Sequence, residues 1–124
     1  MAKVYFGFGI ADGMFNGDLE LHRKDLKQDA DYVQYLLNNP RSSWAEETVI
    51  CLNPSHKATI DAMTKRYGLD DIQIPETAIN VKLETGDSLI VMSPRGLPRL
   101  VDRHEYTDEE IEKATFNFAI WLVK

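Results

Sequence analysis

The chain is poor in cysteine and has no long apolar run. Cys51 is the one cysteine in 124 residues, so no disulfide bond can form within the chain. No apolar stretch approaches the roughly 20 residues that a helix needs to cross a bilayer. The first residues are too few and too aromatic for a secretory signal. We therefore expect a cytoplasmic protein in a reducing compartment, without contact with a membrane.

Positive charge is scarce as well. The sequence has 14 Lys and Arg residues against 20 Asp and Glu residues, a formal net charge of −6. Non-specific binding to a nucleic-acid duplex depends on many contacts between cations and phosphates, so we expect no duplex nucleic acid as a partner. A compact phosphorylated ligand, held by a few local cations and backbone amides, fits this charge balance.

The common cofactor and metal motifs are missing too. The sequence contains no Walker loop, no G-x-G-x-x-G, no C-x-x-C and no H-E-x-x-H. Its histidines, His22, His56 and His104, are too scattered to indicate a metal site. Cys51 falls inside a predicted buried strand and is a poor candidate for a nucleophile. We therefore expect no cofactor, and any catalysis to use a nucleophile that belongs to the substrate.

The length and the order of the elements predict one domain over residues 1–124. Strands alternate with helices, so we expect an α/β fold in which a mixed β-sheet of about five strands is flanked by helices. The predicted strands are Lys3–Ile10, Leu19–His22, Thr48–Leu52, Ile79–Leu83, Ser88–Met92 and Thr115–Val123; the predicted helices cover residues 29–37, 55–68 and 107–114. The last strand is apolar on both faces, which indicates a central strand or a dimer interface.

Local signals fix several boundaries. Asp29 and Thr107 are suitable N-caps, and Thr107 begins a capping box that ends at Glu110. Gly68 suits the left-handed residue that ends many helices. The fourth and fifth predicted strands form a β-hairpin around residues 84–87, where Gly86 supplies a positive φ.

The most informative segment runs from Thr48 to Gly68. A buried strand is followed by Asn53-Pro54 and then by a helix that begins at Ser55, with His56 and Lys57 in its first turn. Unpaired amides and the positive end of the helix dipole make such a corner a natural site for an anion. In open α/β sheets the carboxyl ends of the strands are also the usual place for a ligand.

His56 has two interpretations. It shares a helical face with Ile60, Met63 and Tyr67, so helical periodicity alone accounts for a histidine that caps the helix or lines the edge of the core. The functional interpretation makes His56 a general acid in the cleavage of a phosphodiester.

Other candidate ligand contacts surround this histidine in the sequence. Ser55 and Lys57 are next to it at the start of the helix. Arg95, Arg99 and Arg103 are three arginines within nine residues, and we expect the first two to hold a phosphate, although each can also be an ordinary surface charge. Asp12 ends the first predicted strand and is either a turn residue or a ligand contact.

Two blocks of sequence resemble a known family. They are P-S-H-K-A-T-I-D-A-M-T-K-R-Y-G (54–68) and I-P-E-T-A-I-N-V-K-L-E-T-G-D-S-L-I-V-M (74–92). Both are similar to the small viral ring nucleases, type III anti-CRISPR proteins of archaeal viruses and phages with bacterial relatives. The first strand, K-V-Y-F-G-F-G-I, is similar to theirs as well.

The resemblance implies a homodimer of mixed-sheet α/β subunits that binds cyclic tetra-adenylate across its two-fold axis. It also implies a phosphodiesterase reaction in which a 2′-hydroxyl of the ligand attacks the neighbouring phosphate. The family's motif histidine, matched here by His56, then protonates the leaving 5′-oxygen. This chemistry needs no metal.

The sequence departs from the family around this histidine. Ser55 replaces a glycine, Ala78 stands in the place of an arginine, and Arg95 is the candidate to replace another arginine. These departures leave two alternatives open. The protein is a non-catalytic phage or prophage accessory protein, either a nucleotide sponge or a protein-interaction module that uses the Trp121 face of the sheet, or it is a structural dimer in which His56 caps a helix.

Overall fold

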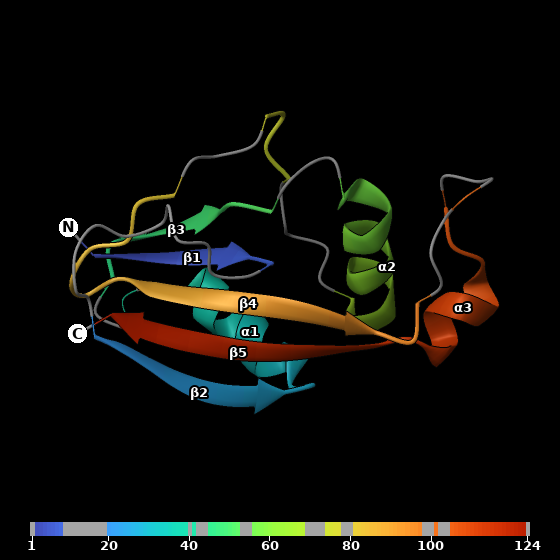
Figure 1. The fold of residues 1–124 in the computed structure, drawn as a ribbon, viewed down its shortest axis with the longest axis horizontal. Coiled ribbons are helices and arrows are strands. Elements are labelled where there is room, and N and C mark those ends of the chain that lie inside the picture. The colour runs from blue at the N-terminus through green and yellow to red at the C-terminus, as the bar shows by residue number, and fades with distance from the viewer. Residues whose placement is uncertain are drawn as a thin grey trace.

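A computed structural model describes residues 2–8, 20–39, 41, 45–52, 56–68, 74–77, 81–97, 101 and 105–123. In this part of the chain five strands form one mixed sheet in the order β2-β5-β4-β1-β3, flanked by helices (Figure 1). The strands are β1 (Lys3–Gly7), β2 (Leu21–Lys27), β3 (Glu47–Ile50), β4 (Ser88–Arg95) and β5 (Thr115–Val123), and the helices are α1 (Ala30–Asn38), α2 (Lys57–Tyr67) and α3 (Asp108–Lys113). The predicted α/β fold is confirmed.

The sheet is parallel on one side and antiparallel on the other. β1 lies between β3 and β4 and runs parallel to both, with Tyr5 opposite Val49 on one edge and Leu89 on the other. β5 runs antiparallel to β4 and β2, so it is central, one of the two positions that its apolar faces predict. The carboxyl ends of β1 and β3 therefore meet at one edge of the sheet, and α2 follows β3 there.

The main core lies between the sheet and the helices α1 and α2. Its largest fully buried side chains come from β1, β4, β5, α1, α2 and the residues after β3: Val4, Phe6, Leu52, Ile60, Met63, Ile90, Met92, Val33, Phe116 and Phe118. Figure 1 shows α1 behind β4 and β5 and α2 beside the end of the parallel strands. Burial of this apolar surface is the main source of stability for a domain of this size.

The opposite face of the sheet carries a second, smaller cluster. Tyr5, Leu89 and Val91 pack there against Val81 and Leu83, which are only 4% exposed each. Trp121 and Cys51 are half-buried at its border. Among the described residues this cluster contains no helical side chain.

The predicted hairpin is wrong in its first arm. Residues 81–83 belong to no strand, and Ile79 lies outside the described residues. The physical reason is the position of β4, because β1 and β5 occupy its two edges and leave no ladder for a further strand. The segment instead lies over the second face of the sheet and buries its alternate side chains. The predicted turn is confirmed, with Gly86 at φ 97°.

Asp87 joins that turn to the two strands that flank β4. Its side chain is 3% exposed and accepts hydrogen bonds from the backbone amides of Lys3 at 2.9 Å and Glu84 at 2.8 Å. Its carbonyl accepts from the amide of Val123 at 3.0 Å. Hydrogen bonds to Asp87 thus connect the start of β1 and the end of β5, the first through its carboxylate and the second through its backbone carbonyl.

Several strand boundaries differ from those predicted. β1 ends at Gly7, short of Ile10, and β3 covers Glu47–Ile50 in place of Thr48–Leu52. β2 begins at Leu21 rather than Leu19 and continues to Lys27, because an exposed edge strand tolerates polar residues that hide the alternation. β4 continues through Pro94 to Arg95, beyond the predicted end at Met92. Pro94 lies opposite Phe116, whose amide points out of this strand pair and donates to the hydroxyl of Tyr67. The two residues are therefore a non-hydrogen-bonded pair of the antiparallel ladder, a position where proline needs no amide hydrogen.

The predicted helix signals are confirmed. Asp29 caps α1 by accepting from the amide of Tyr32 at 3.0 Å, and Thr107 forms the full capping box with Glu110 at α3. Gly68 ends α2 at φ 70°. In the described part of the chain, no helix is long and apolar enough to cross a membrane.

Candidate functional site

His56 lies at the start of α2, immediately beyond the edge where β1 and β3 end. The helix was predicted to begin at Ser55; it begins at Lys57 instead, and His56 is its N-cap. The side chain of His56 is exposed and makes no capping hydrogen bond. The amides of the first turn are therefore left without a cap from this residue, and the helix dipole adds partial positive charge at the same place.

The imidazole of His56 is in contact with an aromatic ring from β1. The centroids of the rings of His56 and Phe8 are 5.0 Å apart, and the ring planes are tilted by 60°. Phe8 directly follows β1, is half-buried and packs against the main core. This contact links the end of β1 to the first turn of α2.

The ends of β1 and β3 approach each other closely behind this contact. The amide of Cys51 donates to the carbonyl of Phe6 at 2.9 Å, and its thiol donates to the same oxygen at 3.1 Å. A Cβ atom on Gly7 would lie 3.0 Å from Sγ of Cys51, so the approach depends on glycine. Burial raises the pKa of Cys51 to about 11, and the thiol is therefore protonated and a poor nucleophile at neutral pH.

Lys57 supplies a cation in the first turn of α2. Its ammonium group lies 2.6 Å from Oδ2 of Asp61, one turn further along the helix. The hydrogen bond to Asp61 raises the pKa of Lys57 above its ordinary value of 10.5, so the charge is present throughout the neutral range. Both side chains are exposed, and a phosphate can compete with the carboxylate for the ammonium group.

Arg95 lies away from His56 within the chain. It pairs with Thr115 in the β4–β5 ladder, next to Ala114, whose carbonyl accepts a hydrogen bond from Arg66 at 3.3 Å. Arg66 is in the last turn of α2, whereas His56 precedes its first turn. Ten residues of helix separate the two positions by about 15 Å. The structure therefore brings His56 and Lys57 together and places Arg95 towards the other end of α2.

Three of the predicted ligand contacts, Asp12, Ser55 and Arg99, lie outside the described residues. Among the described residues no group of three or more His, Cys, Asp and Glu side chains is placed to hold a metal ion.

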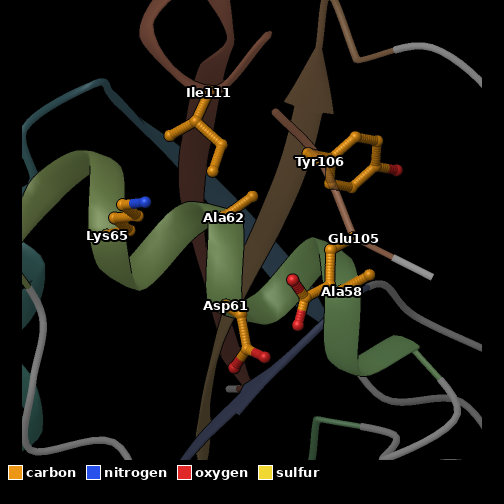
Figure 2. A pocket seen from close by; sticks show the side chains of 7 residues that line it. All are labelled: Ala58, Asp61, Ala62, Lys65, Glu105, Tyr106 and Ile111. Atoms are coloured by element: carbon orange, nitrogen blue, oxygen red, sulfur yellow. The ribbon is translucent and has the colours of Figure 1, made fainter. Parts of the chain in front are cut away.

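A pocket of about 190 Å³ lies on another side of α2, between this helix and the segment that leads into α3 (Figure 2). The small side chains of Ala58 and Ala62 leave this space open. Tyr106, from the segment before α3, and Ile111, from α3 itself, face it from the other side. The charged residues at the pocket are Asp61, Lys65 and Glu105. Sequence reasoning did not find this pocket; two alanines at helical spacing were the only local signal.

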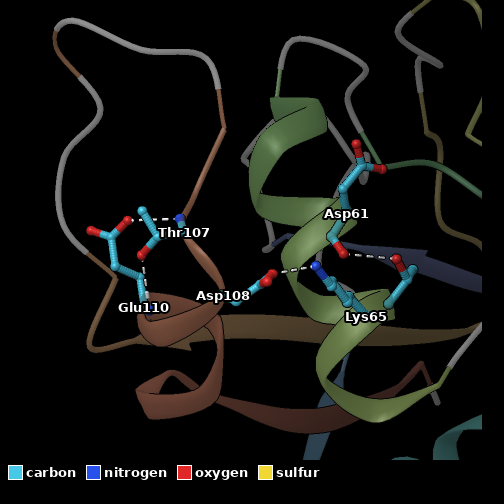
Figure 3. A network of polar contacts seen from close by, with 6 residues as sticks. Asp61, Lys65, Thr107, Asp108 and Glu110 are labelled. Carbon is cyan, nitrogen blue, oxygen red and sulfur yellow. Dashed lines mark hydrogen bonds and ion pairs between the residues drawn. The ribbon is translucent and has the colours of Figure 1, made fainter.

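An ion pair from Lys65, which lines that pocket, connects α2 to α3 (Figure 3). Lys65 lies 2.5 Å from the carboxylate of Asp108, the first residue of α3 after the capping box residue Thr107. The hydrogen bond from Lys65 lowers the pKa of Asp108 below its ordinary value of 3.8. Of the three charged residues at the pocket, Lys65 is thus committed to holding α3 against α2, whereas Asp61 pairs with Lys57 within α2.

Comparison with known proteins gives a likeness in fold. The fold resembles that of a viral protein. The structure of this viral protein, B116 of Sulfolobus turreted icosahedral virus, matches with a TM-score of 0.65 over 98% of the present chain and 99% of the viral chain. The two sequences are 17% identical, so the likeness to B116 concerns the fold. No protein-family model and no curated protein matches the sequence.

Proposed function

We propose that this protein binds a cyclic oligonucleotide second messenger of the oligoadenylate type, in the manner of a ring nuclease, at the corner formed by His56 and Lys57. The observation that carries the proposal is the position of His56. Its side chain is exposed and makes no capping hydrogen bond at the start of α2, just beyond the ends of two parallel strands. The amides of the first turn, which the His56 side chain does not cap, the helix dipole and the ammonium group of Lys57 all favour a phosphate there.

The proposed reaction is cleavage without a metal. A 2′-hydroxyl of the ligand attacks the adjacent phosphorus, the new P–O2′ bond forms, and the P–O5′ bond breaks. His56 gives its proton to the leaving 5′-oxygen, and the 2′-hydroxyl proton passes to water. The products carry a 2′,3′-cyclic phosphate and a 5′-hydroxyl. One general acid and an oriented internal nucleophile are sufficient for this step.

The proposal includes a homodimer in the cytoplasm of a host cell, in the service of a phage or prophage. Support for the dimer comes from the position of Arg95, which within one chain lies about a helix length from His56. A second subunit is the simplest source of an arginine beside the same ligand. The likeness in fold to a viral protein supports the viral setting.

A panel of cyclic oligonucleotides tests the proposal, with cleavage products and affinity measured for wild type and for His56→Ala. The matched control is His22→Ala, because His22 is also exposed but lies on β2, at the opposite edge of the sheet from β3. We expect His56→Ala to abolish cleavage and His22→Ala to leave it unchanged. Tight binding without turnover in wild type would indicate a sponge rather than an enzyme, and absence of binding to every member would refute both.

A second pair of variants tests the phosphate contact. Lys57→Ala removes the cation of the first turn, and Lys65→Ala removes a cation two turns further along the same helix, where it pairs with Asp108. We expect only Lys57→Ala to weaken binding, and to reduce its dependence on salt. Sedimentation at micromolar concentration tests the dimer, and a 14.2 kDa species alone would contradict it.

A protein-interaction module is the second candidate function. Trp121 is half-buried at the border of a cluster that contains no helical side chain among the described residues. If no nucleotide binds, Trp121→Ser in a pull-down from host lysate, compared with His22→Ala, is the next experiment.

A further inference from the structure

We infer that Phe8 is a positioning residue for His56. Phe8 acts through the contact between the two rings and does not itself touch the ligand. In the free protein this means that the Phe8 ring holds the imidazole in one orientation. The consequence for catalysis rests on the proposed function, whereas the orientation itself can be measured without a ligand.

The first support is the geometry of the two rings. Centroids 5.0 Å apart with planes tilted by 60° are typical of an aromatic pair that prefers an edge-to-face arrangement. Such a contact restricts the rotation of the smaller ring about its own side-chain bonds.

The second support is that Phe8 is itself held in place. Its side chain packs against the main core, and its backbone follows Gly7, which is buried. Gly7 lies so close to Cys51 that a Cβ atom on it would be 3.0 Å from Sγ, and Cys51 is bound to the carbonyl of Phe6 through both its amide and its thiol. Residues 6–8 are therefore fixed against the end of β3, and Phe8 presents a rigid surface.

The third support is that α2 does little to orient His56. An N-cap side chain is commonly held by a hydrogen bond to the amides of the first turn, and His56 makes no such bond. An exposed histidine without a restraint samples several staggered rotamers. A general acid has to stand within hydrogen-bond reach of the leaving oxygen, and misplacement by about 1 Å can cost about 100-fold in rate. The ring of Phe8 supplies the restraint that the helix end lacks.

Two substitutions at Phe8 separate the effect of the aromatic ring from that of side-chain size. Phe8→Leu keeps an apolar side chain but loses the ring, and Phe8→Tyr keeps the ring. In the free protein, the three-bond couplings between the α and β protons of His56 report its rotamer. We expect one dominant rotamer in wild type and in Phe8→Tyr, and averaging among rotamers in Phe8→Leu. An unchanged rotamer in Phe8→Leu overturns the inference.

The rate and the affinity for the cyclic oligonucleotide give an independent readout. We expect Phe8→Leu to lower the cleavage rate by about 10-fold or more while the affinity stays within a factor of about two, and Phe8→Tyr to retain the wild-type rate. A loss of affinity with an unchanged His56 rotamer would make Phe8 a ligand contact and overturn the inference. Should Phe8→Leu fail to fold by circular dichroism, Phe8→Met replaces it in both measurements.

These results are distinguishable from failure of the proposed function. If wild type neither binds nor cleaves any member of the panel, the proposed function is refuted and the rotamer measurement still decides the role of Phe8. If wild type cleaves and Phe8→Leu cleaves equally fast, the proposed function stands and the positioning role is refuted.

Discussion

The two ends of α2 are built on opposite principles. At its C-terminal end, the hydroxyl of Tyr67 accepts from the amide of Phe116 at 3.0 Å, its ring lies against Phe116 and Phe118, and Gly68 closes the helix. At the N-terminal end, His56 is exposed, makes no capping hydrogen bond, and is in contact with Phe8. One end is fixed by several independent interactions and the other leaves its polar groups accessible. A helix can thus be anchored at one end and keep the other available for a ligand.

The largest expected effect on stability is at the anchored end. Tyr67→Ala removes a half-buried ring and the acceptor for the Phe116 amide, and we expect the free energy of unfolding to fall by about 2 to 4 kcal/mol. His56→Ala, at the exposed end, should change it by less than about 0.5 kcal/mol. Urea unfolding of both variants measures the difference. Equal losses would contradict the contrast between the ends.

The hydroxyl of Tyr67 can be tested alone. Tyr67→Phe keeps the ring contacts but leaves the partly buried amide of Phe116 without its acceptor. We expect a loss of about 1 to 2 kcal/mol in the free energy of unfolding. Hydrogen exchange at Phe116 should speed up in the same variant, and an unchanged exchange rate would mean that another group satisfies this amide.

The contact between Gly7 and Cys51 lies near the exposed end of α2, and it tests how tightly the ends of β1 and β3 are packed there. Gly7→Ala places a Cβ atom 3.0 Å from Sγ, and we expect it to cost about 1 to 2 kcal/mol. In a Cys51→Ala background the sulfur is gone, and the same substitution should cost about 1 kcal/mol less. A double-mutant cycle by thermal unfolding measures this coupling; additive losses would show that the two residues do not press on each other.

The smallest effect is expected between the two ends, at the ion pair of Lys65 and Asp108. Lys65 holds the pKa of Asp108 below 3.8, so the pair stabilises the folded state above that value and the stabilisation is lost as the pH falls through the lowered folded-state pKa. Lys65→Ala should return the Asp108 pKa to its ordinary range, as measured by a carboxyl-carbon NMR titration. Asp61 serves as an internal control, since it pairs with Lys57.

Sequence reasoning succeeded where local rules decide the structure. The face shared by Ile60, Met63 and Tyr67 follows from helical periodicity, and Asp29, Gly68 and Thr107 mark one end each of α1, α2 and α3. It failed at Ile79–Leu83, because the alternation of a strand and the alternation of a segment lying over a sheet look alike. What excludes the strand is the presence of β1 and β5 on the edges of β4, a fact of topology.

The candidate site was predictable to the same extent. The helix start signal placed His56 and Lys57 at the beginning of α2, but it put the first helical residue two positions too early, at Ser55. The contact with Phe8 joins residues 48 positions apart and depends on how β1 pairs with β3, which no local pattern contains. The separation of Arg95 from His56 also follows from register, because Gly7 at the end of β1 lies opposite Val91, and β4 continues for four residues beyond it.

The turn at Asp87 has a practical consequence for handling the protein. Lys3 and Val123 are both hydrogen-bonded to this one residue, so the start of β1 and the end of β5 lie close together, at the end of the sheet away from α2 (Figure 1). A short linker from Val123 to Lys3 should yield a circularly permuted chain that retains the sheet. Attachment to a sensor surface through either strand end should leave the first turn of α2 facing the solution, where a titrated nucleotide can reach it.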